Sequence, residues 1–314
     1  MDCSALLGFM LLFQPDPSAL IPLYKQALAE REKAFGADHP KVARSATDLG
    51  LYLRNLGDRK GAVALFRRAL AIDLHTLDET HRTVAEDLEN LASVSLPQEA
   101  VVLYRRASKC LDQQIAARNL ANLAALQQAS GDFESAAASY KLALAKEEAA
   151  SGSEHSRVAV RLNDLALLVE PKAAEPLVRR ALAIQQKALG TQHPETGSTL
   201  SNLANILLAT NRLVEAERTQ RQALSTLEAA LGPHHARVGI SCSNLADILA
   251  AKGEYAAARK LYERTLAIDE KIYGPAHPEV AADLENLAAV IDQMGDPQEA
   301  KRLLQRAKQI TAAK

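Results

Sequence analysis

The sequence predicts an all-α fold, a right-handed α-solenoid of stacked antiparallel helix hairpins. Three observations predict it: a short triplet returns along the whole chain, apolar residues follow a helical period, and Gly-Asp pairs punctuate the helices. The composition agrees, because hydrophobic residues make up 48% of the chain and aromatic residues only 4%. Such a composition favours helices packed through small side chains over a β-sandwich.

The triplet is Asn or Asp, then Leu, then Ala or Gly, and it sets the period of the array. Its leucines are 42 residues apart in four of six intervals, and 32 and 38 residues apart in the other two. Such constant register identifies an internal repeat. The leucines are Leu49, Leu91, Leu123, Leu165, Leu203, Leu245 and Leu287.

The last full unit indicates how each repeat folds. Leu284, Leu287 and Ile291 lie on one face of a helix that ends at Gly295, where glycine can adopt the left-handed conformation. Asp296 can then cap a second helix. The same arrangement is expected at Gly57-Asp58, Gly131-Asp132 and Gly253-Glu254. Small, aromatic and small residues recur at fixed offsets in the second helices, as in Ala62/Phe66/Ala69, Ala136/Tyr140/Ala143 and Ala258/Tyr262/Thr265.

The units around Leu91 and Leu165 lose the Gly-Asp turn together with about four residues, and read SVSLPQEA and LALLVEPKAA. Pro97 and Pro171 then begin the second helix, where a missing N–H is tolerated. A further deficit lies near Gln113-Gln114, where a histidine loop is absent. We expect a single array over residues 1–314, with a partial unit at 1–40, complete units at 41–82, 83–114, 115–156, 157–194, 195–236 and 237–278, and a C-terminal capping unit at 279–314.

Charge and cysteine content exclude several classes of protein. With 37 basic and 38 acidic side chains, the chain lacks the basic field that nucleic-acid binding usually needs. Cys3, Cys110 and Cys242 are odd in number and far apart, so they form neither a disulfide framework nor a thiolate zinc site. Cys242 stands where other repeats have leucine, which predicts a small core residue.

The first fourteen residues are apolar on nearly every face. The run Ala5–Phe13 is nine residues long, against the roughly 20 that a membrane helix needs, so we expect no membrane span. Asp2 and the absence of Lys or Arg before the run argue against a signal peptide. We expect a helix of the fold in a cytoplasmic protein; export is the alternative if residues 1–14 act as a signal. An exposed apolar end also predicts self-association through these residues.

Longer segments carry a family resemblance. LYKQALAEREKAFGADHPKVARSATDLGLYLRNLGD and LYERTLAIDEKIYGPAHPEVAADLENLAAVIDQMGD combine L-G-x-x-H-P-like, N-L-A and Ala/aromatic/Ala patterns. They resemble the tetratricopeptide repeat in its 42-residue, kinesin-light-chain-like form, over about Ala19 to Lys308. The resemblance implies a protein-binding α-solenoid. No heptad segment for pairing with a motor heavy chain precedes the repeats, so we expect a scaffold rather than a motor subunit.

One histidine per unit precedes a first helix and raises the question of a metal site. A zinc site needs converging ligands, whereas stacked repeats present one imidazole each at helix-packing distances. We therefore expect loop side chains that bond nearby backbone, and no metal; only His234-His235 merits a metal titration. The recurring histidines are His39, His81, His155, His193, His235 and His277.

Catalytic motifs are missing from the sequence. It lacks G-x-x-x-x-G-K-[ST], H-E-x-x-H, G-x-S-x-G and an EF-hand loop. Glu147-Glu148 is a carboxylate pair most simply read as a solvated helix face. We expect neither enzymatic activity nor a cofactor.

The asparagine of the triplet has two interpretations, and both can hold at different repeats. It lies one residue before the core leucine, at the border between the buried stripe and the inner face of the array. Its amide can tie neighbouring helices together, or a row of amides can bind the backbone of an extended peptide. Asparagines of this face contact cargo peptides in kinesin light chains, and the resemblance implies that role for the matching positions.

The inner face comprises the two residues before each core leucine, the residue five before it and the residue two after it. Six members are acidic, Asp48, Glu86, Glu89, Asp164, Asp247 and Glu285, whereas only Arg44 and Arg118 are basic. Leu51, Val160, Leu167 and Ile240 provide apolar positions between them. We therefore expect a neutral or basic extended segment with aliphatic anchors, centred on Asn202, Asn205, Asn244 and Asp247. The candidate groove residues are Arg44, Asp48, Asn90, Arg118, Asn122, Asn163, Asn202, Asn205, Asn244, Asp247 and Asn286.

Three functions are compatible with these features. The first is a non-enzymatic scaffold that holds a linear segment of a partner protein in its concave groove. The second is a regulatory or sensor array that acts beside a catalytic partner. The third is an exported envelope-assembly factor, which requires residues 1–14 to act as a signal. The sequence favours the first.

Overall fold

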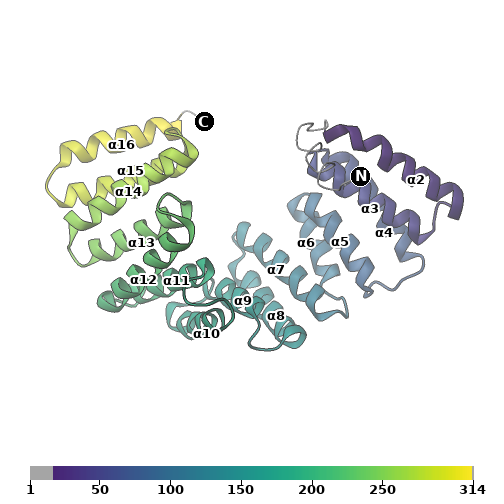
Figure 1. The fold of residues 1–314 in the computed structure, drawn as a ribbon, viewed down its shortest axis with the longest axis horizontal. Coiled ribbons are helices and arrows are strands. Elements are labelled where there is room, and N and C mark those ends of the chain that lie inside the picture. The colour runs from purple at the N-terminus through teal and green to yellow at the C-terminus, as the bar shows by residue number, and fades with distance from the viewer. Residues whose placement is uncertain (1–16, 313–314) are drawn as a thin grey trace, which may run out of the picture. The chain divides into compact units, whose positions relative to one another are not determined.

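The computed structural model describes residues 17–312, and within that range the chain forms fifteen α-helices, one short 3-10 helix and no strand. Successive helices pack against each other as hairpins (Figure 1). The predicted all-α solenoid fold is confirmed. The chain divides into two compact units, an N-terminal unit of residues 1–151 and a C-terminal unit of residues 152–314. The finer unit boundaries given above stay a prediction.

The N-terminal unit has, within its described residues, a leading helix followed by three helix hairpins. A continuous apolar core runs between them and includes Phe66, Leu88 and Leu123. The elements are η1 (Pro17–Leu20), α2 (Ile21–Phe35), α3 (Pro40–Asn55), α4 (Arg59–Leu74), α5 (Arg82–Val94), α6 (Pro97–Ala107), α7 (Gln113–Ala129) and α8 (Phe133–Ser151).

The C-terminal unit contains four helix hairpins in residues 152–312. Leu203 and Leu245, from two of the repeated triplets, belong to its apolar clusters. The elements are α9 (Ser156–Ala166), α10 (Pro171–Leu189), α11 (Pro194–Ala209), α12 (Leu213–Leu231), α13 (Ala236–Ala251), α14 (Tyr255–Tyr273), α15 (Pro278–Gln293) and α16 (Pro297–Ala312).

The recurring histidines are N-caps, which confirms their structural interpretation. In each, imidazole Nδ1 accepts a hydrogen bond from the backbone N–H two residues later, at 3.1–3.2 Å. This satisfies one of the donors left open at a helix start. Helix α7 lacks the histidine, and there Asp112 accepts from the backbone N–H groups of Gln114 and Ile115 at 3.0 and 3.1 Å.

The tight turns largely follow the prediction. Gly253 and Gly295 have φ of 81° and 88°, the left-handed conformation expected at these positions. Asp58, Asp132 and Asp296 accept hydrogen bonds from the backbone three residues on. The expected cap by Glu254 is wrong: its side chain makes no capping bond and instead pairs with Lys252 at 2.5 Å. Glutamate is not among the residue types favoured at an N-cap.

The two units that lack both the Gly-Asp turn and about four residues have short first helices. Helix α5 has 13 residues and α9 has 11, whereas the other first helices, α3, α7, α11, α13 and α15, have 16 or 17. Pro97 and Pro171 begin α6 and α10, as predicted. In each case the proline removes a backbone donor that the first turn leaves unpaired anyway.

Small and aromatic residues pack the two helices of a hairpin together. Phe66 of α4 is completely buried against Gly50 of α3, and a Cβ on Gly50 would lie 2.7 Å from the ring. Cys242 is also completely buried, and desolvation raises the pKa of its thiol to about 11. It is therefore a core residue, as predicted.

Some predictions fall outside the described residues. These are the helical or signal character of residues 1–14, their role in self-association, and Cys3. Within residues 17–312, no helix is both long and apolar enough to span a membrane.

Candidate peptide-binding grooves

Three successive first helices of the N-terminal unit, α3, α5 and α7, border one groove of about 810 Å³. Four predicted site residues line this groove: Arg44 and Asp48 come from α3, Asn90 from α5 and Arg118 from α7. The helical repeat thus brings together side chains from three different units. We call this space the N-terminal groove.

Acidic side chains outnumber basic ones in the N-terminal groove, and three of the five acids are among the predicted inner-face residues. Leu51 and Leu77 add apolar surface between the charges. The acidic members are Asp48, Asp73, Glu86, Asp87 and Glu89, and the basic ones are Lys41, Arg44 and Arg118.

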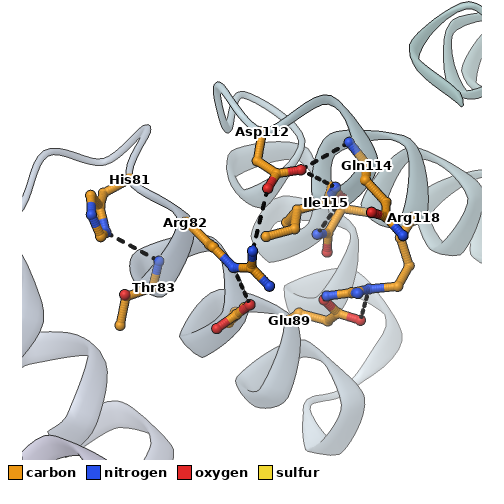
Figure 2. Close-up of polar contacts among 10 residues, drawn as sticks. His81, Arg82, Thr83, Glu89, Asp112, Gln114, Ile115 and Arg118 are labelled. Carbon is orange, nitrogen blue, oxygen red and sulfur yellow. Dashed lines mark hydrogen bonds and ion pairs between the residues drawn. The ribbon is translucent and has the colours of Figure 1, made fainter. Parts of the chain in front are cut away.

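Arg82 and Arg118 pair with acidic side chains from neighbouring elements (Figure 2). Arg118 binds both carboxylate oxygens of Glu89, with Nε at 2.8 and 3.0 Å and Nη2 at 2.5 Å from Oε2. These bonds raise the pKa of the Arg118 guanidinium. Arg82 pairs with Glu86 at 3.0 Å and lies 3.6 Å from Asp112. Arg118 is therefore held by Glu89 of the preceding repeat. Arg82 partly neutralises the negative charge of Glu86, which the sequence prediction counted in full.

A buried carboxyl pair, which the sequence reading missed, also lines the N-terminal groove. Asp87 is 4% exposed, and its Oδ1 accepts a hydrogen bond from Thr47 Oγ1 at 3.4 Å. Burial first, and the neighbouring Asp73 second, raise the pKa of Asp87 from its ordinary 3.8 to about 8. The pair therefore holds a proton at neutral pH.

The C-terminal unit repeats this arrangement between α14 and α15. Burial and the neighbouring Asp269 raise the pKa of Asp283 to about 7. A signal for both pairs exists in the sequence, since Ala-Ile-Asp at 71–73 and 267–269 is followed by aspartate fourteen residues later. Only the packing of helices from successive repeats brings the two carboxyls together.

Two predicted amides of the C-terminal unit contact each other across neighbouring hairpins. Asn163 of α9 donates to Ala159 O at 3.1 Å and to Thr199 Oγ1 of α11 at 2.9 Å. Asn202 of α11 donates to Asn163 Oδ1 at 3.4 Å. The amide of Asn163 is thus used in stacking, whereas Asn202 makes one long bond and also lines a pocket with the exposed Asn205.

Two predicted acidic residues bond other side chains of the chain, which leaves their carboxyl groups less available to bind a peptide. Asp164 pairs with Arg161 at 2.9 Å, and burial raises the pKa of its carboxyl against the opposing effect of that arginine. Asp247 accepts a hydrogen bond from the Tyr262 hydroxyl, and burial raises its pKa as well. Neither Arg161 nor Tyr262 is among the residues predicted for the inner face. The C-terminal unit is consequently less acidic along this face than the count of carboxylates predicts.

The remaining predicted residues lie on first helices at separate places. Asn122 of α7 lines a pocket of about 310 Å³ with Tyr104 of α6. Asn244 of α13 is half-buried, and Asn286 of α15 is exposed. Among the apolar positions, Val160, Leu167 and Ile240 are 42%, 65% and 59% exposed, so each is available for contact with another molecule.

Within residues 17–312, no group of three or more His, Cys, Asp or Glu side chains is arranged to hold a metal ion. His235, from the one adjacent histidine pair, caps α13 by accepting a hydrogen bond from the backbone N–H of Arg237 at 3.1 Å. Its Nδ1 is thereby engaged with the backbone.

Comparison with known families agrees with this architecture. The sequence model described as Tetratricopeptide repeat matches residues 2–75, 168–229 and 237–313, and a second model with that description matches residues 120–151. The chain belongs to the tetratricopeptide repeat family. This family is generally non-catalytic, and its fold is that of a protein-interaction scaffold.

Relatives place the repeats in the kinesin-light-chain-like type. Protein KINESIN LIGHT CHAIN-RELATED 3 of Arabidopsis thaliana is 25% identical over 207 residues, which cover 62% of this tetratricopeptide repeat chain and 32% of that protein. The chain therefore spans about a third of the length of that relative.

Solved structures show the same repeat fold. The crystal structure of BtubC (BKLC) from P. vanneervenii has a TM-score of 0.58 and 25% identity, covering 72% of this chain and 91% of that one. Aspartyl phosphate phosphatase F from Bacillus subtilis has a TM-score of 0.61 with 12% identity, covering 90% and 74%. At 12% identity the likeness concerns the fold alone.

Proposed function

We propose that this tetratricopeptide repeat protein is a non-enzymatic scaffold that binds an extended, neutral or basic segment of a partner protein along its first helices. The observation that carries the proposal is the N-terminal groove of about 810 Å³, because its lining comes mainly from the first helices α3 and α5 and reaches the next first helix, α7, at Arg118. A groove that crosses three repeats matches an extended chain better than a compact small molecule.

The charge of the groove supports the preference for a neutral or basic segment. Five carboxyl groups face three basic side chains. Because the Asp73–Asp87 pair keeps one proton at neutral pH, four negative charges oppose three positive ones, and Arg118 is held by Glu89. Asp48 and Arg44 make no ion pair within residues 17–312, and both are exposed. Acidic peptides are disfavoured at such a surface, since like charges brought together raise the free energy of the complex.

The reactive side chains have structural roles, which supports a non-enzymatic function. The recurring histidines are bonded to backbone N–H groups through Nδ1. The thiol of Cys242 is buried, and its raised pKa keeps it protonated at neutral pH, which makes it a poor nucleophile.

Selection of peptides from a random display library on the full chain tests this function. We expect enrichment of sequences with Lys or Arg and aliphatic residues, and depletion of Asp and Glu. A double variant, Asp48→Lys with Glu86→Lys, should shift the enrichment towards acidic peptides. Glu134→Lys, at an exposed position on α8 away from the groove, is the matched control and should leave the selection unchanged. Enrichment of acidic peptides on the unaltered chain would contradict the proposal.

A further inference from the structure

The two shortened hairpins change the surface of the hairpin that follows each of them. Helices α3, α7, α11, α13 and α15 all end six residues after their core leucine. Helix α5 ends at Val94, three residues after Leu91, and α9 ends at Ala166, one residue after Leu165. Since a helical turn has about 3.6 residues, each short helix lacks roughly one turn at its C-terminal end.

The missing turn contains the position four residues after the core leucine. In a full-length first helix, the large side chain at this position is buried against the neighbouring helices. At the same position the short hairpins have Ser95 and Val169, which are only half-buried. The buried side chains at this position are Leu53, Gln127, Leu207, Leu249 and Ile291.

An open pocket lies at each of these places, and the two pockets match position by position. In the C-terminal unit a pocket of about 230 Å³ lies between the short turn, α10 and α11; we call it the Leu167 pocket. In the N-terminal unit a pocket of about 310 Å³ lies between the short turn, α6 and α7. Counted from Leu165 or Leu91, the short hairpin contributes the residues at +1, +2, +4, +6, +9 and +13 to its pocket in both cases. The lost turn is the structural feature that the two places share.

The Leu167 pocket has chemistry suited to one aliphatic side chain. Leu167, Val169, Val178 and Ile206 line it, and none of its lining residues is charged. A charged side chain placed there would lose hydration without a partner. Its volume lies below the roughly 300–1,000 Å³ typical of small-molecule sites, which favours a single side chain over a whole ligand.

Amides lie beside this apolar pocket. Asn202 and the exposed Asn205, both on α11, line it. A primary amide both donates and accepts, which matches the N–H and C=O groups of an extended backbone. The pocket of the N-terminal unit has Asn122 at the first position but Ala125 at the second, so it offers one amide instead of two.

We propose that the Leu167 pocket receives one Leu, Ile or Val side chain of the partner's extended segment, with Asn202 and Asn205 bonding the backbone on either side of it. The inference rests on the proposed function. It specifies the pocket that anchors the segment and the type of residue that enters this pocket. The shortened turn is then a binding feature of the array and not merely an irregularity.

The first test uses a minimal probe, N-acetyl-leucine-N-methylamide, which has one aliphatic side chain between two peptide groups. In the full chain with labelled Ile, Leu and Val methyl groups, we expect saturable NMR shifts at Val169, Val178 and Ile206. The glycine and lysine analogues of the probe should cause no such shifts. Absence of leucine-probe shifts at these methyl groups would overturn the inference, even if library peptides bind elsewhere.

The second test fills the pocket. Ala209→Phe replaces an exposed lining residue of α11, and Ala251→Phe makes the same change at the same register of α13, which follows a full-length hairpin. We expect Ala209→Phe to weaken library-selected peptides about tenfold or more and to abolish the probe shifts, with Ala251→Phe unchanged in both. Equal peptide affinity for Ala209→Phe and the unaltered chain would overturn the inference while leaving the scaffold function intact. A library without binders would instead contradict the scaffold function, and the probe would still decide the pocket.

Discussion

Asp87 links the stability of the N-terminal unit to pH. Its pKa is about 8 in the folded chain against an ordinary 3.8, so the folded state binds a proton more tightly than the unfolded state. The resulting stabilisation is complete below about pH 4 and is lost as the pH rises to about 8. The pair consists of Asp87 and Asp73 of α4, and the groups around it are Thr47 of α3, Glu86 of α5 and His81.

Asp87→Asn should therefore stabilise the chain at pH 8 by more than about 1 kcal/mol and flatten the decline in stability between pH 5 and 8. An amide at this position can donate to Asp73 without needing the shared proton. Chemical unfolding at several pH values measures the effect. Asp48→Asn, at an exposed position of the same groove, is the control and should leave the slope unchanged. If the free energy of unfolding fell equally steeply with pH in Asp87→Asn and in the unaltered chain, the two aspartates would not share a proton.

The histidine caps allow a test with adjacent residues. His235 caps α13, whereas the side chain of His234 makes no capping bond to this helix. Because an N-cap contributes about 0.5–2 kcal/mol, His235→Ala should lower the melting temperature and His234→Ala should not. His235→Asn should retain most of the stability, since asparagine also accepts at an N-cap. Equal melting temperatures for the two alanine variants would contradict the capping role.

At the scale of the helix pair, steric fit and helix propensity oppose each other. Alanine is favoured over glycine inside a helix by about 0.5–1 kcal/mol. At Gly50 the added Cβ would meet the buried Phe66 ring at 2.7 Å, and overpacking of this kind costs about 1–3 kcal/mol. At Gly239 the nearest atoms would lie at 3.4 Å, an ordinary contact.

Gly50→Ala should therefore destabilise the chain, and Gly239→Ala should stabilise it slightly. Thermal unfolding compares the melting temperatures of the two variants. Adding Phe66→Leu to Gly50→Ala should partly restore the lost stability. If Gly50→Ala raised the melting temperature, the close packing of α3 on α4 would be incorrect.

The helix pair is also the scale at which the sequence is most informative. The hairpins are predictable because each depends on local signals. Gly253 indicates a turn, Pro97 indicates the start of a helix, and the repeated leucines indicate a buried helix face. The Asp73–Asp87 pair and the Leu167 pocket were not predictable in this way. Both depend on which side chains from separate helices meet after packing, and one lost turn changes that set. Glu254 was misread because its register matched the capping aspartates although its side chain does not cap.

Over the whole chain, basic and acidic side chains are nearly equal in number, but they are unevenly distributed. The 37 basic and 38 acidic side chains nearly cancel, yet the N-terminal groove has an excess of carboxyl groups. Binding of a basic segment there should weaken several-fold as salt is raised from low to physiological ionic strength, because exposed charges are screened. Affinity of a selected basic peptide at several salt concentrations measures this. Glu134→Lys should show the same salt dependence, and Asp48→Lys a smaller one.

The binding of an extended partner segment along the first helices is tested by calorimetric titration of a library-selected peptide into Asn90→Ala, in the N-terminal groove, and Asn202→Ala, in the Leu167 pocket. Removing an amide that bonds the bound peptide should cost about 1–3 kcal/mol of binding free energy. We expect this loss of affinity with unchanged melting temperatures. Unchanged affinity in both variants, with lowered melting temperatures instead, would contradict it and assign these asparagines to the stacking of repeats.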